Sequence, residues 1–298
     1  MVKRIFVKNQ KKDRKMSIKG YVIEKYNKMT NAYTCNRLVE EAENLGMDLK
    51  IIGIHDTMIL ENEIRNSGVV LEKRDFVINR YKWGKEKDDI NSLAVRSYNP
   101  LEVYNIYINK YEQVKRLRSK SFVVPKYLLG TARIKFDEIT DILGIPFVAK
   151  GLESSMGEQI FLIETDEDMR NLCQKYGMEK EWLFEEFVTT SYGRDMRFYS
   201  IRGEVIACMQ RKSQGDFRAN VALGASVEAY KITPEIRQIA KDIYEQTGLD
   251  LLGIDLLFGE DKPYFCEINV MPGIEGIEKA TGVNVAGKIM ETIKKDFE

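Results

Sequence analysis

The chain has 298 residues, of which 44% are hydrophobic, so it is long enough to bury a substantial core and to form two domains. No apolar run approaches the ~20 residues that span a membrane, and no signal peptide with an apolar core is visible. The single histidine, His55, nearly excludes a histidine-based triad or a His-rich zinc site. Any chemistry therefore has to rest on carboxylates, cations and backbone groups.

The charge of the chain is unevenly distributed, although its 46 basic and 46 acidic residues cancel. Residues 1–15 form a basic tail with seven basic side chains and one acidic residue, Asp13. The remainder has a net charge of −6, so we expect no nucleic-acid partner. We interpret the tail as solvated or as sequence before a second start at Met16; an arm for nucleic acid or an anionic membrane is the other interpretation.

The cysteines are typical of a reducing compartment, and we expect the protein in the cytoplasm. They are far apart in the sequence and form no C-x-x-C pair: Cys35, Cys173, Cys208 and Cys266.

Residues 16–105 predict a small α/β domain with a parallel sheet, because strands alternate with a helix. The helix is expected over residues 36–45, where apolar residues recur at helical spacing and Gly46 ends the pattern. The domain lacks a G-x-G-x-x-G fingerprint, which argues against a dinucleotide site. His55 is interpreted as a surface or loop histidine. Strands are expected at residues 21–23, 49–54, 76–79 and 93–98.

A small polar loop at residues 151–159 is bounded by glycines, and Lys150 stands at its entrance. Backbone N–H groups and serine hydroxyls in such a loop can cradle phosphates, and Lys150 adds a positive charge. A surface hairpin with an exposed lysine has the same pattern. The elements expected around it are a helix over residues 101–119 containing Asn109-Lys110, an extended segment at 122–126, helices over 137–143 and 165–176, and strands at 145–150 and 160–163.

The region after this loop places charged residues on expected strands. Glu185 and Glu186 stand among apolar residues, in either an edge strand or a connector that reads the edge of an adenine. Arg197 and Arg211 lie on a hairpin, where they fit a cleft that binds anions in a fork geometry. The expected elements are a strand at residues 182–188, a hairpin of 194–201 and 204–212, and helices from Thr233 to Gly248 and over 283–297.

Residues 249–270 predict a hairpin with a five-residue loop. If the loop is symmetric, Asp255 lies opposite Glu267, and Gly253 lies opposite Asn269 and leaves room beside the amide. Opposed carboxylates destabilise a ladder, and a hard divalent cation reverses that effect. Asp255, Glu267 and Asn269 offer the oxygen ligands that suit Mg²⁺ or Mn²⁺. The alternative is a hairpin whose carboxylates are solvated or salt-bridged.

Five segments of the C-terminal half occur in a characteristic order and spacing: EEFV, RDMR, RKSQGDFRAN, GIDLLF and CEINVMPGIEGIEKATGVNVAGK. With these segments, the chain from about residue 145 to the C-terminus resembles the ATP-grasp superfamily, most closely its RimK-like branch. The founding member of that branch adds glutamate to a ribosomal protein. The helix with Asn109-Lys110 extends the match upstream, while the N-terminal domain matches only in pattern.

The resemblance implies an α/β (α+β) ATP-grasp fold, in which a small N-terminal parallel α/β domain precedes a two-lobed module with nucleotide in its cleft. The expected division is a basic tail at residues 1–15, an N-terminal domain at 16–105, a central lobe with the phosphate flap at 106–181, and a C-terminal lobe with the metal site at 182–298.

The resemblance also implies roles for individual residues. The phosphates of the nucleotide would be contacted by Lys110 and Lys150 and covered by a flap of Ser154, Ser155, Met156 and Gly157. The adenine pocket would be lined by Glu185, Glu186, Phe187 and Val188. Two further side chains would contact the nucleotide, Asp195 and Arg218. Two Mg²⁺ or Mn²⁺ ions would be held by Asp255, Glu267 and Asn269. The reacting groups would be held by Arg197 and Arg211, with Asn220 in a substrate-proximal loop.

The implied activity is an ATP- and metal-dependent, ADP-forming ligase that joins a carboxylate to an amino-acid amine through an acyl phosphate. The partners would be ATP, an amino acid such as glutamate, and a carboxylate acceptor in a peptide, protein tail or small metabolite. A homo-oligomer is a further expectation from the resemblance. The alternative is an ATP-binding regulator or scaffold without ligase activity.

The sequence departs from the family pattern in two places. The flap has fewer glycines than usual, and Ala219 and residues 223–225 replace a more polar and glycine-rich loop. These differences concern the substrate more than the ATP chemistry.

Overall fold

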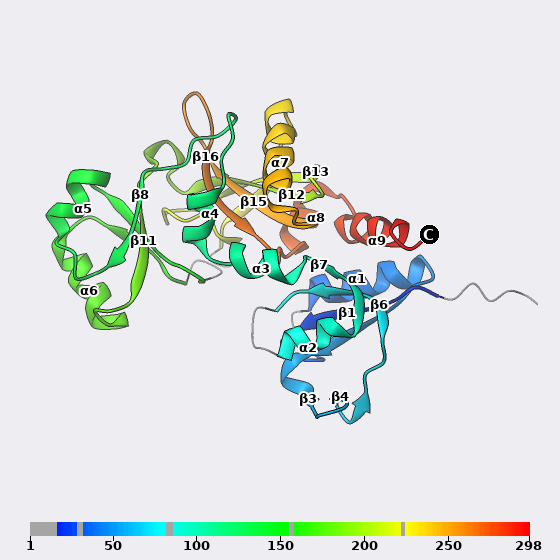
Figure 1. Ribbon diagram of the computed structural model, residues 1–298. Helices are drawn as coiled ribbons and strands as arrows, with labels where there is room; N and C mark the ends of the chain where they lie inside the picture. Colours follow the sequence, from blue (N-terminus) through cyan, green and yellow to red (C-terminus); the bar gives the residue numbers. More distant parts are fainter. Residues whose placement is uncertain (1–16, 29–31, 82–85, 155–157, 222–223) are drawn as a thin grey trace, which may run out of the picture.

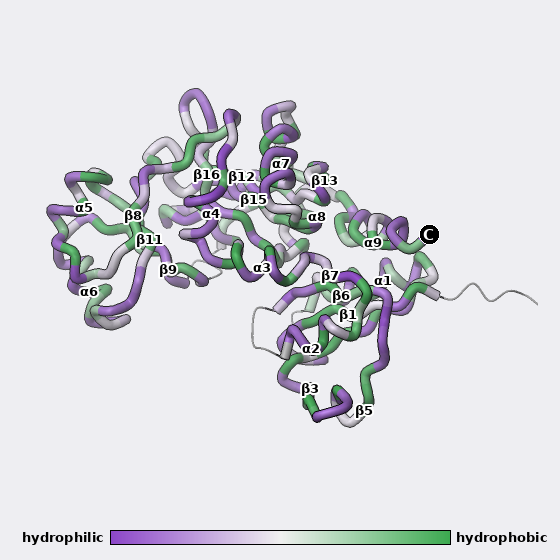
Figure 2. Tube along the Cα trace, in the orientation of Figure 1, coloured by the Kyte–Doolittle hydropathy of each residue, from purple (hydrophilic) through white to green (hydrophobic). Residues whose placement is uncertain are grey.

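A computed structural model describes residues 17–28, 32–81, 86–154, 158–221 and 224–298. Figure 1 shows three lobes: an N-terminal domain with β1 to β7, a central lobe with α5, α6 and β8 to β11, and a C-terminal lobe with β12 to β16 and α7 to α9. Figure 2 shows hydrophobic residues along the strands inside these lobes and hydrophilic residues on many of the surrounding loops and helix surfaces. Within the described ranges, no helix is long and apolar enough to cross a membrane.

The N-terminal domain contains the predicted parallel sheet, with strand order β2-β1-β6-β7. Its strands are apolar because helices and the C-terminal lobe cover them. A second, short sheet (β3, β4, β5) was not predicted. The elements are β1 Lys19–Glu24, α1 Tyr33–Asn44, β2 Asp48–Gly53, the 3₁₀ turn η1 Ile54–Asp56, β3 Thr57–Ile59, β4 Ile64–Asn66, β5 Val69–Val70, β6 Arg74–Asn79, α2 Glu86–Ser92 and β7 Ala94–Tyr98.

The central lobe is an antiparallel sheet in the order β10-β9-β11-β8, with α5 and α6 packed on an aromatic core. The interpretation of residues 182–188 as an edge strand is wrong, because β11 pairs with both β9 and β8. Strand β8 was not predicted. The elements are β8 Tyr127–Thr131, α5 Phe136–Leu143, β9 Phe147–Gly151, β10 Ile160–Ile163, α6 Asp166–Tyr176 and β11 Glu181–Glu186.

The C-terminal lobe is an antiparallel sheet in the order β14-β13-β12-β15-β16. Helix α7 forms as predicted, because Thr233 caps its first turn and Gly248 ends it in a left-handed conformation, with φ +64°. Helix α8 and strand β14 were not predicted. The elements are the 3₁₀ turn η2 Thr189–Ser191, β12 Arg194–Ile201, β13 Glu204–Lys212, β14 Ser226–Ala229, α7 Pro234–Thr247, β15 Leu251–Leu257, β16 Tyr264–Asn269, α8 Glu275–Thr281 and α9 Val285–Lys295.

The single helix expected over residues 101–119 is wrong: the chain forms α3 Leu101–Tyr107 and α4 Lys110–Arg116. The break occurs at Asn109, whose Oδ1 accepts hydrogen bonds from the backbone N–H of Tyr111 at 2.9 Å and Glu112 at 3.3 Å. A new helix therefore begins at Lys110, which lies in its first turn.

The metal-site hairpin has the predicted register, with Asp255 opposite Glu267 and Gly253 opposite Asn269. Nearer the loop, an irregularity at Cys266 shifts the pairing by one residue, and the loop between the strands has six residues rather than five. The expectation of open space beside Gly253 is wrong. A Cβ added there would lie 2.9 Å from Cβ of Pro272, so the absence of a side chain permits close packing of Pro272.

The N-terminal domain and the C-terminal lobe share one hydrophobic core, and α1 packs against α9. Asn99 joins the two parts through its buried side chain. Its Nδ2 donates to the carbonyl oxygens of Leu251 at 2.8 Å and Val270 at 3.1 Å, and its Oδ1 accepts from the N–H of Leu251 at 2.7 Å. One side chain thus fixes β15 and the end of β16 against the N-terminal domain.

We expect Asn99→Ala to lower the free energy of unfolding by about 3 kcal/mol, because buried backbone groups lose their partners at about 1–3 kcal/mol each. Denaturant unfolding measures the change. Asn62→Ala, at an exposed position, is the control and should lie within about 0.5 kcal/mol of wild type. Equal stability of the two variants would contradict the role of Asn99.

Candidate active site

Charged side chains from four neighbouring strands form a row across one face of the C-terminal sheet. Arg211 on β13 pairs with Asp195 on β12, Arg197 on β12 pairs with Asp255 on β15, and Asp255 pairs with Glu267 on β16. Residues two apart on a strand share a face, which places Asp195 beside Arg197. The sheet register therefore brings together residues that are far apart in sequence.

The arginines make fork-like contacts with the two aspartates. Arg211 donates to Asp195 through Nε and Nη2, both at 2.6 Å, and to Asp255 Oδ2 at 2.8 Å. Arg197 donates to Asp255 through Nε at 2.6 Å and Nη2 at 2.5 Å. Charge-assisted pairs of this kind are strong and directional. In the described structure, these arginines bind aspartates, while the notion that they hold a substrate anion stays a prediction.

The two aspartates differ in pKa because Asp255 accepts hydrogen bonds from two arginines, while Asp195 accepts them from Arg211 alone. Burial raises the pKa of Asp195 to about 6, and Arg211 only partly offsets it. Burial acts in the same direction on Asp255, but Arg197 and Arg211 together outweigh it and lower its pKa to about 2. Asp255 is therefore held as a carboxylate, the form that binds a metal ion.

Lys110 connects the row to the flap. Its Nζ lies 3.2 Å from Glu267 Oε2 and donates to the carbonyl oxygen of Ser154 at 2.5 Å. The backbone N–H of Lys110 donates to the carbonyl oxygen of Leu152 at 2.8 Å. The start of α4 thus lies between the expected metal ligands and the expected flap. Ser155, Met156 and Gly157, the other expected flap residues, lie outside the described residues.

A buried ion pair joins Lys150 on β9 to Glu185 on β11. Burial acts to lower the pKa of Lys150, but the neighbouring charge of Glu185 opposes it, and the pKa lies above its usual value. Glu185 Oε1 is buried and has no hydrogen-bond partner among the described residues. An unpaired acceptor at such a position is costly unless a donor completes it. The pair is therefore consistent with a site whose ligand supplies that donor.

Cys266 is a residue of this cleft that sequence reasoning did not find. Lys150 Nζ lies 3.9 Å from its Sγ. Burial raises the pKa of this thiol to about 12, so it stays neutral at physiological pH. The irregular pairing at Cys266 accounts for its contact with the cleft, and no local sequence signal marks such an irregularity.

The expected adenine pocket continues from β11 into the connector to the C-terminal lobe. Lys126 and Glu186 are linked by two hydrogen bonds of 2.9 Å, one from each backbone N–H. The ring of Phe187 lies against those of Tyr192 and Phe217, with centroids 6.0 and 6.2 Å apart. Val188 is buried. The connector therefore combines aromatic and apolar side chains, which can pack on a planar base, with backbone polar groups, which can hydrogen-bond to its edge.

The polar loop after β13 reaches the central lobe through Arg218. Its Nη2 lies 2.7 Å from Asp216 Oδ2, and its Nη1 lies 3.5 Å from the carbonyl oxygen of Ile160 on β10. Asn220 accepts a backbone hydrogen bond from Ala225 at 3.3 Å. The substrate-proximal roles of these two side chains stay predictions.

The donor set fits a hard divalent ion only if Asn269 takes part. Among the described residues, no three or more His, Cys, Asp and Glu side chains form a group that could hold a metal ion. Asp255 and Glu267 are paired on adjacent strands. Asn269, two residues after Glu267, adds an amide oxygen. In the structure, this oxygen accepts a hydrogen bond of 2.9 Å from the N–H of Met271. Oxygen ligands of this kind suit Mg²⁺ or Mn²⁺.

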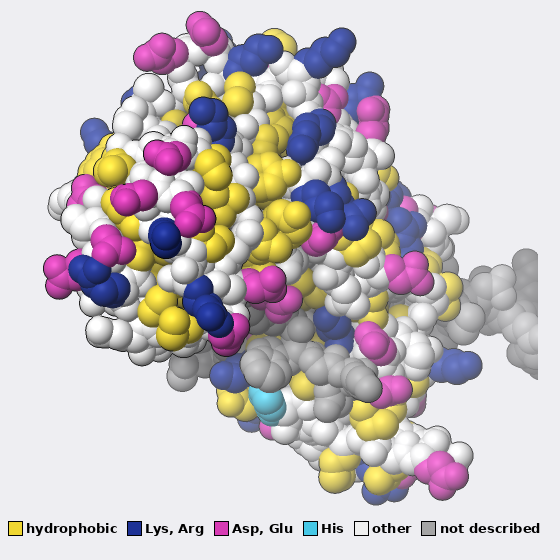
Figure 3. All heavy atoms as spheres, turned by 60° about the vertical axis from the view of Figure 1, so that its left-hand side comes forward, with side chains coloured by type: hydrophobic (Ala, Val, Ile, Leu, Met, Phe, Trp, Pro, Cys, Tyr) yellow, Lys and Arg dark blue, Asp and Glu magenta, His cyan; other side chains and the backbone are white. Residues whose placement is uncertain are grey.

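His55 is exposed and distant in sequence from these groups, as predicted for a surface histidine; it is the single cyan side chain in Figure 3. Its Nε2 lies 3.3 Å from the hydroxyl of Tyr81.

A family model described as the RimK-like ATP-grasp domain matches residues 108–293. The chain belongs to the RimK-like ATP-grasp family. Two similar proteins carry the name "Probable alpha-L-glutamate ligase". The protein from Aliivibrio fischeri is 33% identical over 282 residues, and that from Methanococcoides burtonii is 32% identical over 282 residues. Each match covers 88% of this chain and 92% of the relative. The predicted family and the predicted class, an ATP-dependent ligase, are confirmed.

Solved structures confirm the predicted fold. The ATP-grasp ligase PsnB with a minimal precursor matches with a TM-score of 0.71 and 18% identity, over 94% of this chain and 99% of that chain. The D-alanine–D-alanine ligase of Bacillus anthracis with ATP matches with a TM-score of 0.67 and 14% identity, over 95% and 100% of the two chains. PsnB has also been solved with its precursor, Mg and ADP.

We predict strong energetic coupling between Lys150 and Glu185. Lys150→Met or Glu185→Gln alone should each lower the free energy of unfolding by about 3 kcal/mol, because a buried charge loses its partner. The double variant should lose less than the sum of the single changes. A double-mutant cycle in denaturant measures the coupling.

The matched control for this cycle is the exposed pair Arg133 and Glu179, whose charged atoms lie 2.7 Å apart. Arg133→Met and Glu179→Gln should show coupling below about 1 kcal/mol, because solvent screens exposed pairs. Similar coupling in both pairs would argue against a special role for the buried one.

Proposed function

We propose that this protein joins the amine of an α-amino acid, glutamate in the first instance, to a carboxylate acceptor, with conversion of ATP to ADP and phosphate. The observation that carries the proposal is the arrangement of Asp255, Glu267 and Asn269 on paired strands beside Lys110 and Arg197. The names of the relatives, alpha-L-glutamate ligases, support glutamate as the donor.

Nucleotide binding divides between the lobes in this proposal. Lys110 and Lys150 neutralise the α- and β-phosphates, and the loop from Ser154 covers them. Glu185 supplies its unpaired carboxylate oxygen to a donor of the nucleotide. The remaining proposed contacts are with Glu186, Phe187 and Val188 at the base, and with Asp195 and Arg218 at the ribose and phosphates.

Asp255, Glu267 and Asn269 would hold Mg²⁺ or Mn²⁺, two ions in the full proposal. Such ions stabilise negative charge on the transferring phosphoryl group. Lys110 and Arg197 now compensate the carboxylates of Glu267 and Asp255. We propose that binding of the metal and nucleotide exchanges these partners, so that the carboxylates face the metal and the cations face phosphate oxygens.

The proposed chemistry has two steps. A carboxylate oxygen of the acceptor attacks the γ-phosphorus, the bond to the β–γ bridging oxygen breaks, and ADP leaves. The amine nitrogen then attacks the carbonyl carbon of the acyl phosphate, phosphate leaves, and the amine proton passes to a base or to water. Arg197, Arg211 and Asn220 would orient the reacting groups, so catalysis rests on positioning and charge stabilisation rather than on a covalent enzyme intermediate.

A peptide or protein tail is the acceptor we favour, with a small metabolite as the other possibility. PsnB, which shares the fold, has been solved with a precursor peptide. We further propose a homo-oligomer in the cytoplasm, with no membrane or nucleic-acid partner, and the free cysteines suit a reducing compartment.

The direct test is ADP release with ATP and Mg²⁺ or Mn²⁺, using an amino-acid panel with candidate acceptor peptides. Glutamate and glutamine form the informative pair, because they differ mainly in one charge. We expect turnover that requires glutamate. ATP-dependent thermal stabilisation without turnover under any mixture would favour a binding protein or a missing acceptor.

We predict that Glu267→Gln folds normally and lowers ADP release at least ~100-fold, because it loses a carboxylate ligand of the metal. Glu260→Gln, at an exposed position in the loop of the same hairpin, is the control and should retain wild-type turnover. Melting temperatures check that both variants are folded. Full activity of Glu267→Gln would exclude the proposed metal site.

A further inference from the structure

Strand β16, which carries two of the proposed metal ligands, lies at the edge of the C-terminal sheet. In an edge strand, alternate N–H and C=O groups face away from the sheet. Ile268 is such a residue, because both its N–H and its carbonyl oxygen bond to a side chain outside the sheet. It stands between Glu267 and Asn269, so the position of its backbone affects both ligands.

The side chain that binds Ile268 is Gln113 on α4, the helix that lies alongside β16 in Figure 1. Gln113 Oε1 accepts from the N–H of Ile268 at 2.8 Å, and Nε2 donates to the carbonyl oxygen of Ile268 at 2.9 Å. A side-chain amide offers the same donor and acceptor as a peptide group, so Gln113 takes the place of a neighbouring strand. Gln113 is only 3% exposed, so water cannot readily replace it.

The other hydrogen of the Gln113 amide bonds to the end of α3. Nε2 donates to the carbonyl oxygen of Tyr107 at 2.6 Å. Tyr107 is the last residue of α3, where carbonyl oxygens have no partner inside the helix. Gln113 thus joins three elements: the end of α3, the helix α4 that carries it, and β16.

Lys110 and Gln113 stand three residues apart on α4, so they lie on the same side of the helix. Lys110 Nζ lies 3.2 Å from Glu267 Oε2, and Gln113 holds the next residue of the strand, Ile268. In the proposed exchange of partners, Lys110 leaves Glu267 for a phosphate oxygen. The uncharged contact of Gln113 can persist through this exchange, because it involves only the backbone of β16.

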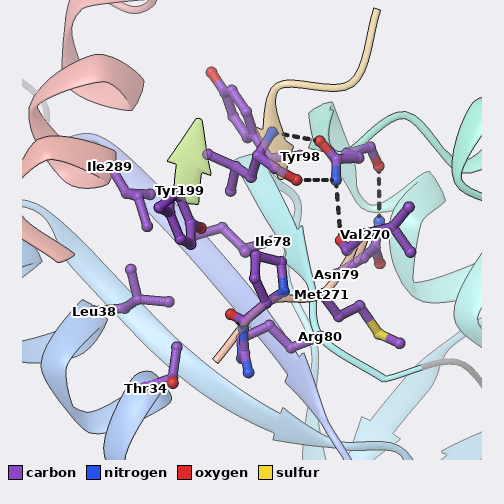
Figure 4. A pocket seen from close by; sticks show the side chains of 13 residues that line it. Thr34, Leu38, Ile78, Asn79, Arg80, Tyr98, Tyr199, Val270, Met271 and Ile289 are labelled. Carbon is purple, nitrogen blue, oxygen red and sulfur yellow. Dashed lines mark hydrogen bonds between the residues drawn. The ribbon is translucent and has the colours of Figure 1, made fainter. Parts of the chain in front are cut away.

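The outer edge of β16 is also held on either side of its ligand-bearing part. The N–H of Phe265 donates to the carbonyl oxygen of Val123 at 2.8 Å, and the carbonyl oxygen of Val270 accepts from Asn99 at 3.1 Å. Figure 4 shows Val270 among side chains of the N-terminal domain, around a space of about 10 Å³ with room for about one water. Between these two points, Gln113 is the one described residue that bonds to the outward-facing backbone of β16.

We propose that Gln113 is a positioning residue of the metal site, which fixes the backbone between Glu267 and Asn269 so that both oxygens can meet one ion. Mg²⁺ requires near-ideal octahedral geometry, which a loosely held ligand strand does not provide. Groups that orient metal ligands typically contribute ~10–100-fold in metal affinity. This inference rests on the proposed function, because it concerns the metal site of that reaction.

Gln246 on α7 makes matching contacts at a place without proposed ligands. Its Oε1 accepts from the N–H of Arg118 at 2.9 Å, and its Nε2 donates to the carbonyl oxygens of Arg118 and Asp242, both at 2.7 Å. Gln246 is exposed, whereas Gln113 is buried. Gln246→Met therefore shows what the loss of such an amide does away from the metal site.

The test measures the affinity for ATP by calorimetry, at a fixed subsaturating Mg²⁺ concentration and with a chelator, in Gln113→Met and Gln246→Met. In Gln113→Met, the affinity with Mg²⁺ should fall ~10–100-fold, and the affinity without metal should stay within about twofold. The second result is expected because the Asn109 cap still starts α4 at Lys110. Gln246→Met should leave both affinities unchanged. Melting temperatures check that the variants are folded.

Gln113→Glu is the second variant, for the case in which Gln113→Met does not fold. Its carboxylate keeps the length of the side chain and the acceptor for the N–H of Ile268, but it loses both donations. The added negative charge by itself would strengthen the binding of a cation. The expected fall in affinity with Mg²⁺ therefore identifies a change in the geometry of the site.

The outcomes separate this inference from the proposed function. Unchanged affinity with Mg²⁺ in a folded Gln113 variant, with a metal-dependent gain in the wild type, overturns the positioning role and leaves the ligase proposal standing. Equal losses with and without metal also overturn it, because they indicate a general loosening of the cleft. Absence of a metal-dependent gain in the wild type overturns the proposed metal site together with this inference.

Discussion

Four carboxylates and four cations meet where the central and C-terminal lobes join, and the structure depends on their balance. The acids are Asp195, Asp255, Glu267 and Glu185, and the cations are Arg197, Arg211, Lys110 and Lys150. A buried charge without a partner costs several kcal/mol, so the buried groups among them require their partners in the absence of a ligand. A metal–nucleotide complex can replace these partners, because its metal ion can pair with the carboxylates and its phosphates can pair with the cations. The cations that the phosphates require and the carboxylates that the metal requires thus neutralise one another before either ligand binds.

The surrounding fold positions these pairs. The break at Asn109 starts α4 at Lys110, and Lys150, which pairs with Glu185 in the central lobe, lies close to Cys266 of the C-terminal lobe. The N-terminal domain takes part through the core that it shares with α8 and α9 and through Asn99. It is therefore packed against the C-terminal lobe through a shared core rather than attached as an independent module.

The sequence predicted most of what local patterns control. The pairing of Asp255 with Glu267 was predicted from a symmetric five-residue loop; the loop has six residues, and the irregularity at Cys266 restores the predicted register. Helix α7 followed from Thr233, Pro234 and Gly248. The break at Asn109 carried a signal that was missed, an Asn cap with Glu112 three residues on. Short strands such as β4 show too little alternation to be found, and the irregularity at Cys266 depends on pairing. The contacts of Arg211 with Asp195 and Asp255 depend on the order of strands in the sheet, which no local pattern contains.

The most direct test of the central claim is a calorimetric titration with ATP, performed once with Mg²⁺ and once with a chelator in its place. In this account, Lys110 and Arg197 leave Glu267 and Asp255 to bind phosphate oxygens of the nucleotide. Without a metal ion, the two carboxylates would then repel the phosphates of ATP. The affinity for ATP should therefore fall at least ~100-fold when the metal is removed. Equal affinity with and without metal would contradict the account, because it would mean that nucleotide binding does not engage this network.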